Sequence, residues 1–123
     1  DASDWARIAA LYGQLAQVLP SPVVELNRAV AVAMCDGPAA GLALLEPLAA
    51  LPALARYPWL PAVQGDLLAR LGRHAEASTA FERAAALSEN AREQALMRQR
   101  AADAAAAADA GGAAAQPPRF QAS

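Results

Sequence analysis

The 123-residue sequence contains no lysine, and it has one cysteine, Cys35, and one histidine, His74. A single cysteine cannot form an internal disulfide, and one cysteine with one histidine falls short of the four ligands of a structural zinc site. No apolar run reaches the 18 residues that indicate a transmembrane helix, and no signal peptide is expected. The sequence therefore predicts a cytoplasmic protein that has no membrane partner and no metal site.

Excess positive charge is also lacking, because the sequence has ten arginines and twelve acidic residues, which give a net charge of -2. A nucleic-acid-binding domain usually carries a basic patch or stripe, and none is visible. The arginines at 92, 98 and 100 have acidic neighbours at 89, 93 and 103, and such a mixture of charges is typical of a solvated helix face. We expect no direct nucleic-acid binding by this chain.

Catalytic groupings are missing as well. His74 would need a nucleophile or an orienting carboxylate beside it to act in catalysis, and the sequence around it offers no such set. We therefore expect a protein that is not an enzyme, with no catalytic residue and no cofactor.

Alanine is abundant, with 37 residues, and it has the highest helix propensity of all amino acids. β-Branched residues are few, and no strand-like alternation extends beyond a few positions. The sequence thus predicts an all-α domain, a tetratricopeptide-like right-handed stack of about six helices. The expected helices span residues 3–19, 22–35, 38–51, 61–71, 73–87 and 88–108.

Proline and glycine mark the expected helix ends. Pro20 stops the first helix, Ser21 caps the second, and Pro22 occupies its first position, where a missing N–H costs nothing. Gly37 and Gly72 each close an apolar helical run. Pro47 is expected to kink or break the helix over 38–51, and Ser88 is expected to cap the last helix.

The segment 65–87 carries two helical apolar patterns that meet at Gly72. Small residues stand where two helices must approach closely, at Gly65, Ala77 and Ala84, and Phe81 fills the space between them. This arrangement is typical of a tetratricopeptide helix pair, whose repeat is about 34 residues long. Residues 1–110 are predicted to form this domain, and the Ala/Gly/Pro-rich residues 111–123 to be a disordered tail.

Three strings carry a more specific resemblance: DWARIAALY at 4–12, PSPVVELNRAV at 20–30 and DGPAAGL at 36–42. With the continuation through 66–90, the chain resembles the C-terminal extension of a subfamily of extracytoplasmic-function RNA polymerase sigma factors over about residues 4–100. The second string is the most specific of the three.

The resemblance implies a tetratricopeptide-like domain that modulates a sigma factor through contacts with its core domains or with RNA polymerase. The sequence itself has no helix-turn-helix with a basic recognition helix, so it lacks the DNA-binding sigma regions. Two other functions remain open: a free-standing tetratricopeptide adaptor, and a small helical domain that binds a metabolite in its groove.

In a stack of helix pairs, the first helix of each pair lines the inner surface. The helices over 22–35 and 61–71 should do so here, and we expect a partner to contact their polar residues Glu25, Arg28, Gln64, Asp66 and Arg70. Asn27 lies on an apolar face and is expected to bond backbone groups. Trp5 and Trp59 are expected in the core rather than at an interface.

Overall fold

The computed structural model describes residues 2–115, which form six α-helices and one short 3-10 helix and contain no strand. The elements are α1 (Ala2–Val18), α2 (Pro22–Asp36), α3 (Pro38–Ala49), η1 (Pro52–Leu54), α4 (Trp59–Arg70), α5 (His74–Leu87) and α6 (Ala91–Ala115). The all-α prediction is confirmed, and most helix ends fall within two residues of their expected positions.

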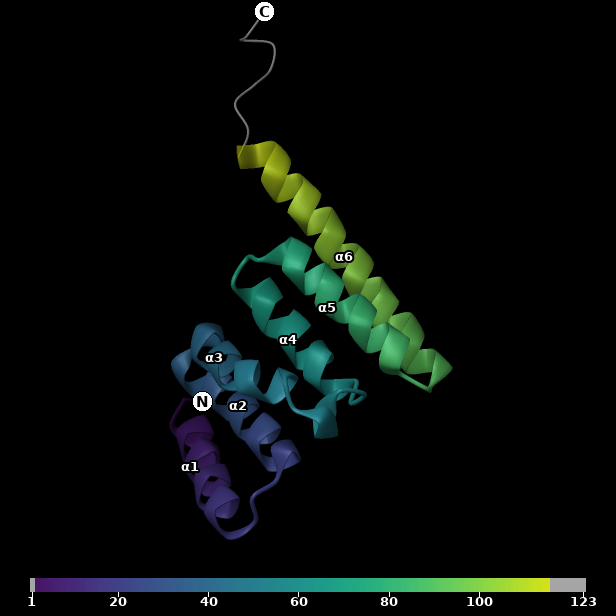
Figure 1. Cartoon of the computed structure of the whole chain (residues 1–123). Coiled ribbons are helices and arrows are strands. Elements are labelled where there is room, and N and C mark those ends of the chain that lie inside the picture. The colour runs from purple at the N-terminus through teal and green to yellow at the C-terminus, as the bar shows by residue number, and fades with distance from the viewer. Residues whose placement is uncertain (1, 116–123) are drawn as a thin grey trace, which may run out of the picture.

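The helices stack in chain order, as Figure 1 shows, with α1 at one end and α6 lying along α5 at the other. Helices α2 and α3 form one tightly packed pair, and α4 and α5 form a second. The junction between the pairs is a thinner contact of α3 with α4, and η1 connects these two helices.

Two glycines with positive φ allow the sharp turns inside the pairs. Gly37 (φ 101°) lies between α2 and α3, and Gly72 (φ 79°) lies between α4 and α5. At the second turn the Gly72 N–H donates to Ala69 O at 3.0 Å, and the Arg73 N–H donates to Leu68 O at 2.9 Å. These two bonds form a Schellman motif, which satisfies carbonyls at the end of α4.

The start of α2 follows the predicted arrangement in its backbone but not in its side chain. Ser21 is the N-cap residue in an extended conformation and Pro22 is the first helical residue, as expected. The Ser21 side chain makes no capping hydrogen bond, however, and its carbonyl accepts from the Glu25 N–H at 3.1 Å instead.

The apolar core has two parts. The larger one lies between α2, α3, η1 and α4, and Leu26 and Leu45 are fully buried in it. The smaller one joins α5 to α6 through Ala77, Phe81, Ala101 and Ala104, with Leu68 of α4 packed against it. Phe81 therefore links the second helix pair to α6.

Two glycines stand at the closest helix crossings. A Cβ placed on Gly41 would lie 2.5 Å from the Ala33 Cβ and 3.0 Å from the Ala29 carbonyl oxygen. A Cβ on Gly65 would lie 2.7 Å from the Phe81 ring. The predicted close contact of α4 with α5 at Gly65 is thus confirmed, and Gly41 provides a similar contact between α3 and α2.

Two helix signals differ from their expected effect. Pro47 lies inside α3 without ending it, and the helix continues to Ala49. The missing N–H falls in the last turn, so one backbone bond at most is lost there.

At the start of α6, Asn90 Oδ1 accepts from the N–H groups of Arg92 (2.8 Å) and Glu93 (3.2 Å), whereas the Ser88 hydroxyl donates back to Ala84 O of α5 (2.8 Å).

The last helix is longer than expected. It continues through Gly111 to Ala115, five residues into the segment predicted to be a tail, and the remaining predicted tail, 116–123, lies outside the described residues. Alanine propensity over 101–110 explains the extension, since it offsets the cost of two glycines in a helix.

Substitution of Gly41 by alanine should destabilise the fold by about 1 to 3 kcal/mol, because backbone and side-chain atoms of α2 occupy the space of the new methyl group. The matched control is Gly111→Ala, since no atom lies within 4 Å of its added Cβ. Urea unfolding midpoints should fall for the first variant and stay level or rise for the second. Equal midpoints would contradict the close crossing of α2 and α3.

Replacement of Ala77 by leucine should cost about 1 to 3 kcal/mol, because Ala77 is fully buried between Phe81 and the alanines of α6. Ala86→Leu, at an exposed position of the same helix, is the control. A thermal melt that shows no lower transition temperature for Ala77→Leu than for the control would disprove the tight packing of α5 on α6.

Candidate protein-interaction surface

The five polar residues predicted to share one partner surface lie on three different surfaces. Glu25 and Arg28 line a hollow beside α1, Gln64 lines one between α3 and the second pair, and Asp66 and Arg70 line a groove between α2, α4 and α6. The structure thus keeps only the last two together in a groove formed by three helices.

The first surface is a local ion pair beside the first helix. Arg28 Nη1 lies 3.4 Å from Glu25 Oε2, one helical turn away, and both side chains are about one-third exposed. Gln14 and Gln17 of α1 line the same hollow. A long, partly solvated pair of this kind contributes little to stability, and its charges cancel locally.

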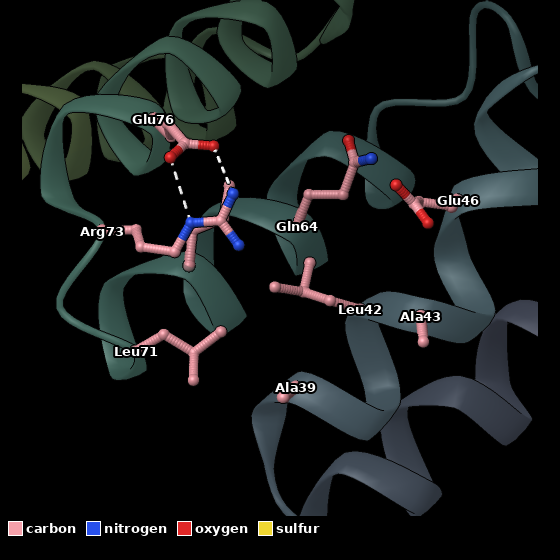
Figure 2. Close-up of a pocket in the computed structure, with 9 residues that line it drawn as sticks. Ala39, Leu42, Ala43, Glu46, Gln64, Leu71, Arg73 and Glu76 are labelled. Carbon is pink, nitrogen blue, oxygen red and sulfur yellow. Dashed lines mark hydrogen bonds and ion pairs between the residues drawn. The ribbon is translucent and has the colours of Figure 1, made fainter.

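The second surface is the hollow of about 390 Å³ shown in Figure 2. Gln64 of α4 and Glu46 of α3 extend from facing helices, with Leu42 between them and the α4–α5 turn. Arg73 and Glu76 close the hollow on the side of α5. Arg73 Nε donates to Glu76 Oε1 at 3.0 Å and Nη2 donates to Oε2 at 2.7 Å.

This two-point contact stabilises the charged forms of both partners. The hydrogen bonds from Arg73 lower the pKa of the Glu76 carboxyl, and those same bonds raise the pKa of the Arg73 guanidinium. The stabilisation is present above the ordinary carboxyl pKa and is lost as the pH falls through the lowered value. Both side chains are more than half exposed, so water screens most of the effect.

The third surface is the groove between α2, α4 and α6, which we call the inner groove. It consists of two adjoining hollows of about 310 and 480 Å³ that share Trp59, Ala62, Met97 and Arg100. The first hollow is lined further by Val30, Ala33, Met34, Val63, Asp66, Leu67 and Arg70, and the second by Tyr57, Pro58, Ser88, Glu93 and Leu96.

The two arginines of the inner groove have N–H groups without a strong hydrogen-bond acceptor. Arg70 Nη2 lies 3.2 Å from Asp66 Oδ2, and Arg70 Nη1 lies 3.2 Å from the Met34 sulfur, which is a weak acceptor. Arg100 makes no hydrogen bond or ion pair with any residue in the described part of the chain. Guanidinium N–H groups therefore remain available at this surface.

Large apolar side chains surround these charges. Trp59 is 48% exposed, Leu96 is 47% exposed and Met34 is 38% exposed, so each presents apolar surface to solvent. The expectation that Trp59 lies in the core is wrong. Trp59 is the first residue of α4 and stands at the edge of the core, which Leu60 and Val63 of the same helix enter. Trp5 is partly buried.

Sequence reasoning missed Met34, Met97 and Arg100 as members of this surface. Arg100 was predicted to lie on a solvated helix face of mixed charge, and only the helices over 22–35 and 61–71 were predicted to line the inner surface. The available signal was the helical spacing of Glu93, Met97 and Arg100, which places all three on one face of α6.

Other singled-out residues have structural surroundings. Asn27 is partly buried, and its amide makes no hydrogen bond within the described residues, so the predicted backbone bond is wrong. Cys35 lies at the end of α2, where a hydrogen bond with Asp36 raises the pKa of its thiol. Across residues 2–115, no group of three or more side chains from His, Cys, Asp and Glu is placed to hold a metal ion.

Arg73→Gln should raise the pKa of Glu76 towards the ordinary glutamate value of about 4.3, because the charge-assisted bonds that stabilise the carboxylate are lost. An NMR titration of the side-chain carboxyl resonances would measure it. Arg83→Gln, also on α5, is the control, and a Glu76 pKa that is the same in all three proteins would contradict the pairing.

Comparison with known proteins identifies a longer relative. The chain is 50% identical over 96 residues to an uncharacterized protein of Rhizobium meliloti (strain 1021), and the match covers 78% of this chain and 22% of that protein. The chain thus spans about a fifth of the length of this relative. No family model and no solved structure matches. No helix within residues 2–115 combines the length and the apolar character needed to cross a bilayer.

Proposed function

We propose that this chain is a cytoplasmic protein-interaction domain that regulates an extracytoplasmic-function RNA polymerase sigma factor. Its partner would be the core domains of that sigma factor or RNA polymerase. The domain would act by holding a segment of this partner, without chemistry of its own.

The observation that carries the proposal is the inner groove. Helices α2, α4 and α6 form it, and exposed Trp59 and Met34 and partly buried Met97 line it beside two arginines. Tryptophan and arginine are enriched among the residues that dominate protein–protein binding, and methionine adapts its shape to different partners. The sequence resemblance adds the sigma factor as the setting.

The charge of the groove favours a protein segment over a nucleic-acid backbone. Arg70 and Arg100 are offset by Asp66 and Glu93 in the same surface, so the whole groove is close to neutral. A nucleic acid needs several uncompensated positive charges along one path. A protein partner can instead match both the apolar and the charged parts.

The Rhizobium relative offers a direct test, because four-fifths of its length lies outside the matched segment. We expect the full-length relative to direct core RNA polymerase to defined start sites in run-off transcription of genomic DNA. Deletion of the matched segment should reduce initiation, and a chimera that carries this chain in its place should restore it.

Variants of that chimera separate the groove from general folding. Arg70→Gln with Trp59→Ala should lower initiation at least fivefold, while Arg98→Gln, exposed on α6 and outside both hollows, should leave it unchanged. If the relative gives no initiation above core polymerase alone, the link to sigma factors fails. If it initiates equally well without the matched segment, the regulatory role fails.

A further inference from the structure

We propose that the inner groove binds an acidic peptide segment that carries a bulky apolar side chain. This inference rests on the proposed function and deepens it, because it specifies the chemistry of the partner segment. It follows from the different composition of the two hollows and from the free donors between them.

The apolar side chain has a defined place in the larger hollow. Tyr57, Pro58 and Trp59 of the segment before and at the start of α4 face Leu96 and Met97 of α6 across about 480 Å³. Burial of Trp59 and Leu96, each nearly half exposed, would remove apolar surface from water. A phenylalanine or leucine side chain fits the chemistry of this lining.

The acidic character follows from the smaller hollow. Its lining contains two guanidinium groups, Arg70 and Arg100, and one carboxylate, Asp66, which gives this hollow one excess positive charge, whereas Glu93, which makes the whole groove close to neutral, lines only the larger hollow. Asp66 occupies one nitrogen of Arg70, and Arg100 has no partner among the described residues. A carboxylate can accept two parallel N–H bonds from a guanidinium group, which an amide or a hydroxyl cannot match.

The other two hollows lack this combination. In the hollow of Figure 2, Arg73 is held at two points by Glu76, and Glu46 adds a further negative charge. Beside α1, Arg28 is paired with Glu25. Neither of these hollows contains tryptophan or methionine, so the inner groove is the best supported of these surfaces for an acidic, apolar segment.

Trp59 provides a direct readout of binding. The chain has two tryptophans, so Trp5→Phe leaves Trp59 as the single reporter in the full chain. Three synthetic 12-residue peptides serve as probes. The first alternates Glu with Phe and Leu, the second has Lys in place of each Glu, and the third has Ala in place of each Phe and Leu.

We expect the first peptide to change the Trp59 emission and to bind at least tenfold more tightly than either of the others. Raising the salt concentration from 50 to 300 mM should weaken it, since exposed charge contacts are screened. The double variant Arg70→Gln with Arg100→Gln should lose at least tenfold in affinity for the first peptide, and Arg98→Gln should change it less than twofold. Thermal melts of both variants establish that they are folded.

Several results would overturn the inference. They are equal or tighter binding of the lysine peptide, no binding of any peptide, an Arg98→Gln effect as large as that of the double variant, or tighter binding of a 12-nucleotide single-stranded DNA. These results leave the transcription assay of the Rhizobium chimera unaffected, so a wrong partner chemistry and a wrong proposed function can be told apart.

Discussion

The structure depends on the close approach of helices at positions where a side chain would not fit. Gly41 of α3 lies against Ala29 and Ala33 of α2, and Gly65 of α4 lies against the Phe81 ring of α5. These crossings bring the helix axes near enough for Leu26 and Leu45 to be fully buried with few aromatic residues in the chain. An alanine-rich sequence can form a dense core only in this way, because short side chains fill little space between distant helices.

The inner groove is a consequence of the same packing. Helix α4 packs on the core through Val63 and Leu67, which border the inner groove, and on α5 through Gly65. Trp59, Asp66 and Arg70 recur at helical spacing on the remaining face, and α2 and α6 stand beside it. A helix that is fixed on two sides presents its third face as a rigid surface, so less conformational entropy is lost when a partner binds.

Local signals in the sequence were sufficient for most of the fold. Alanine content, the Pro20–Pro22 stop and the Gly37 and Gly72 turns each act within a few residues, and the helix ends followed them. The errors arose where two local signals competed. Asn90 and Ser88 both suit a helix start, and Ser88 bonds α5 instead. Pro47 lay close enough to a helix end to be tolerated.

The surface was harder to predict, because it depends on which face of each helix meets a neighbour distant in sequence. Gln64 and Asp66 are two residues apart, hence about 200° apart around α4, and cannot share one surface. Arg100 joins Arg70 only because Phe81, Ala101 and Ala104 hold α6 against α5. The recognition surface therefore exists only in the assembled stack, and its charge follows from helix packing rather than from any short motif.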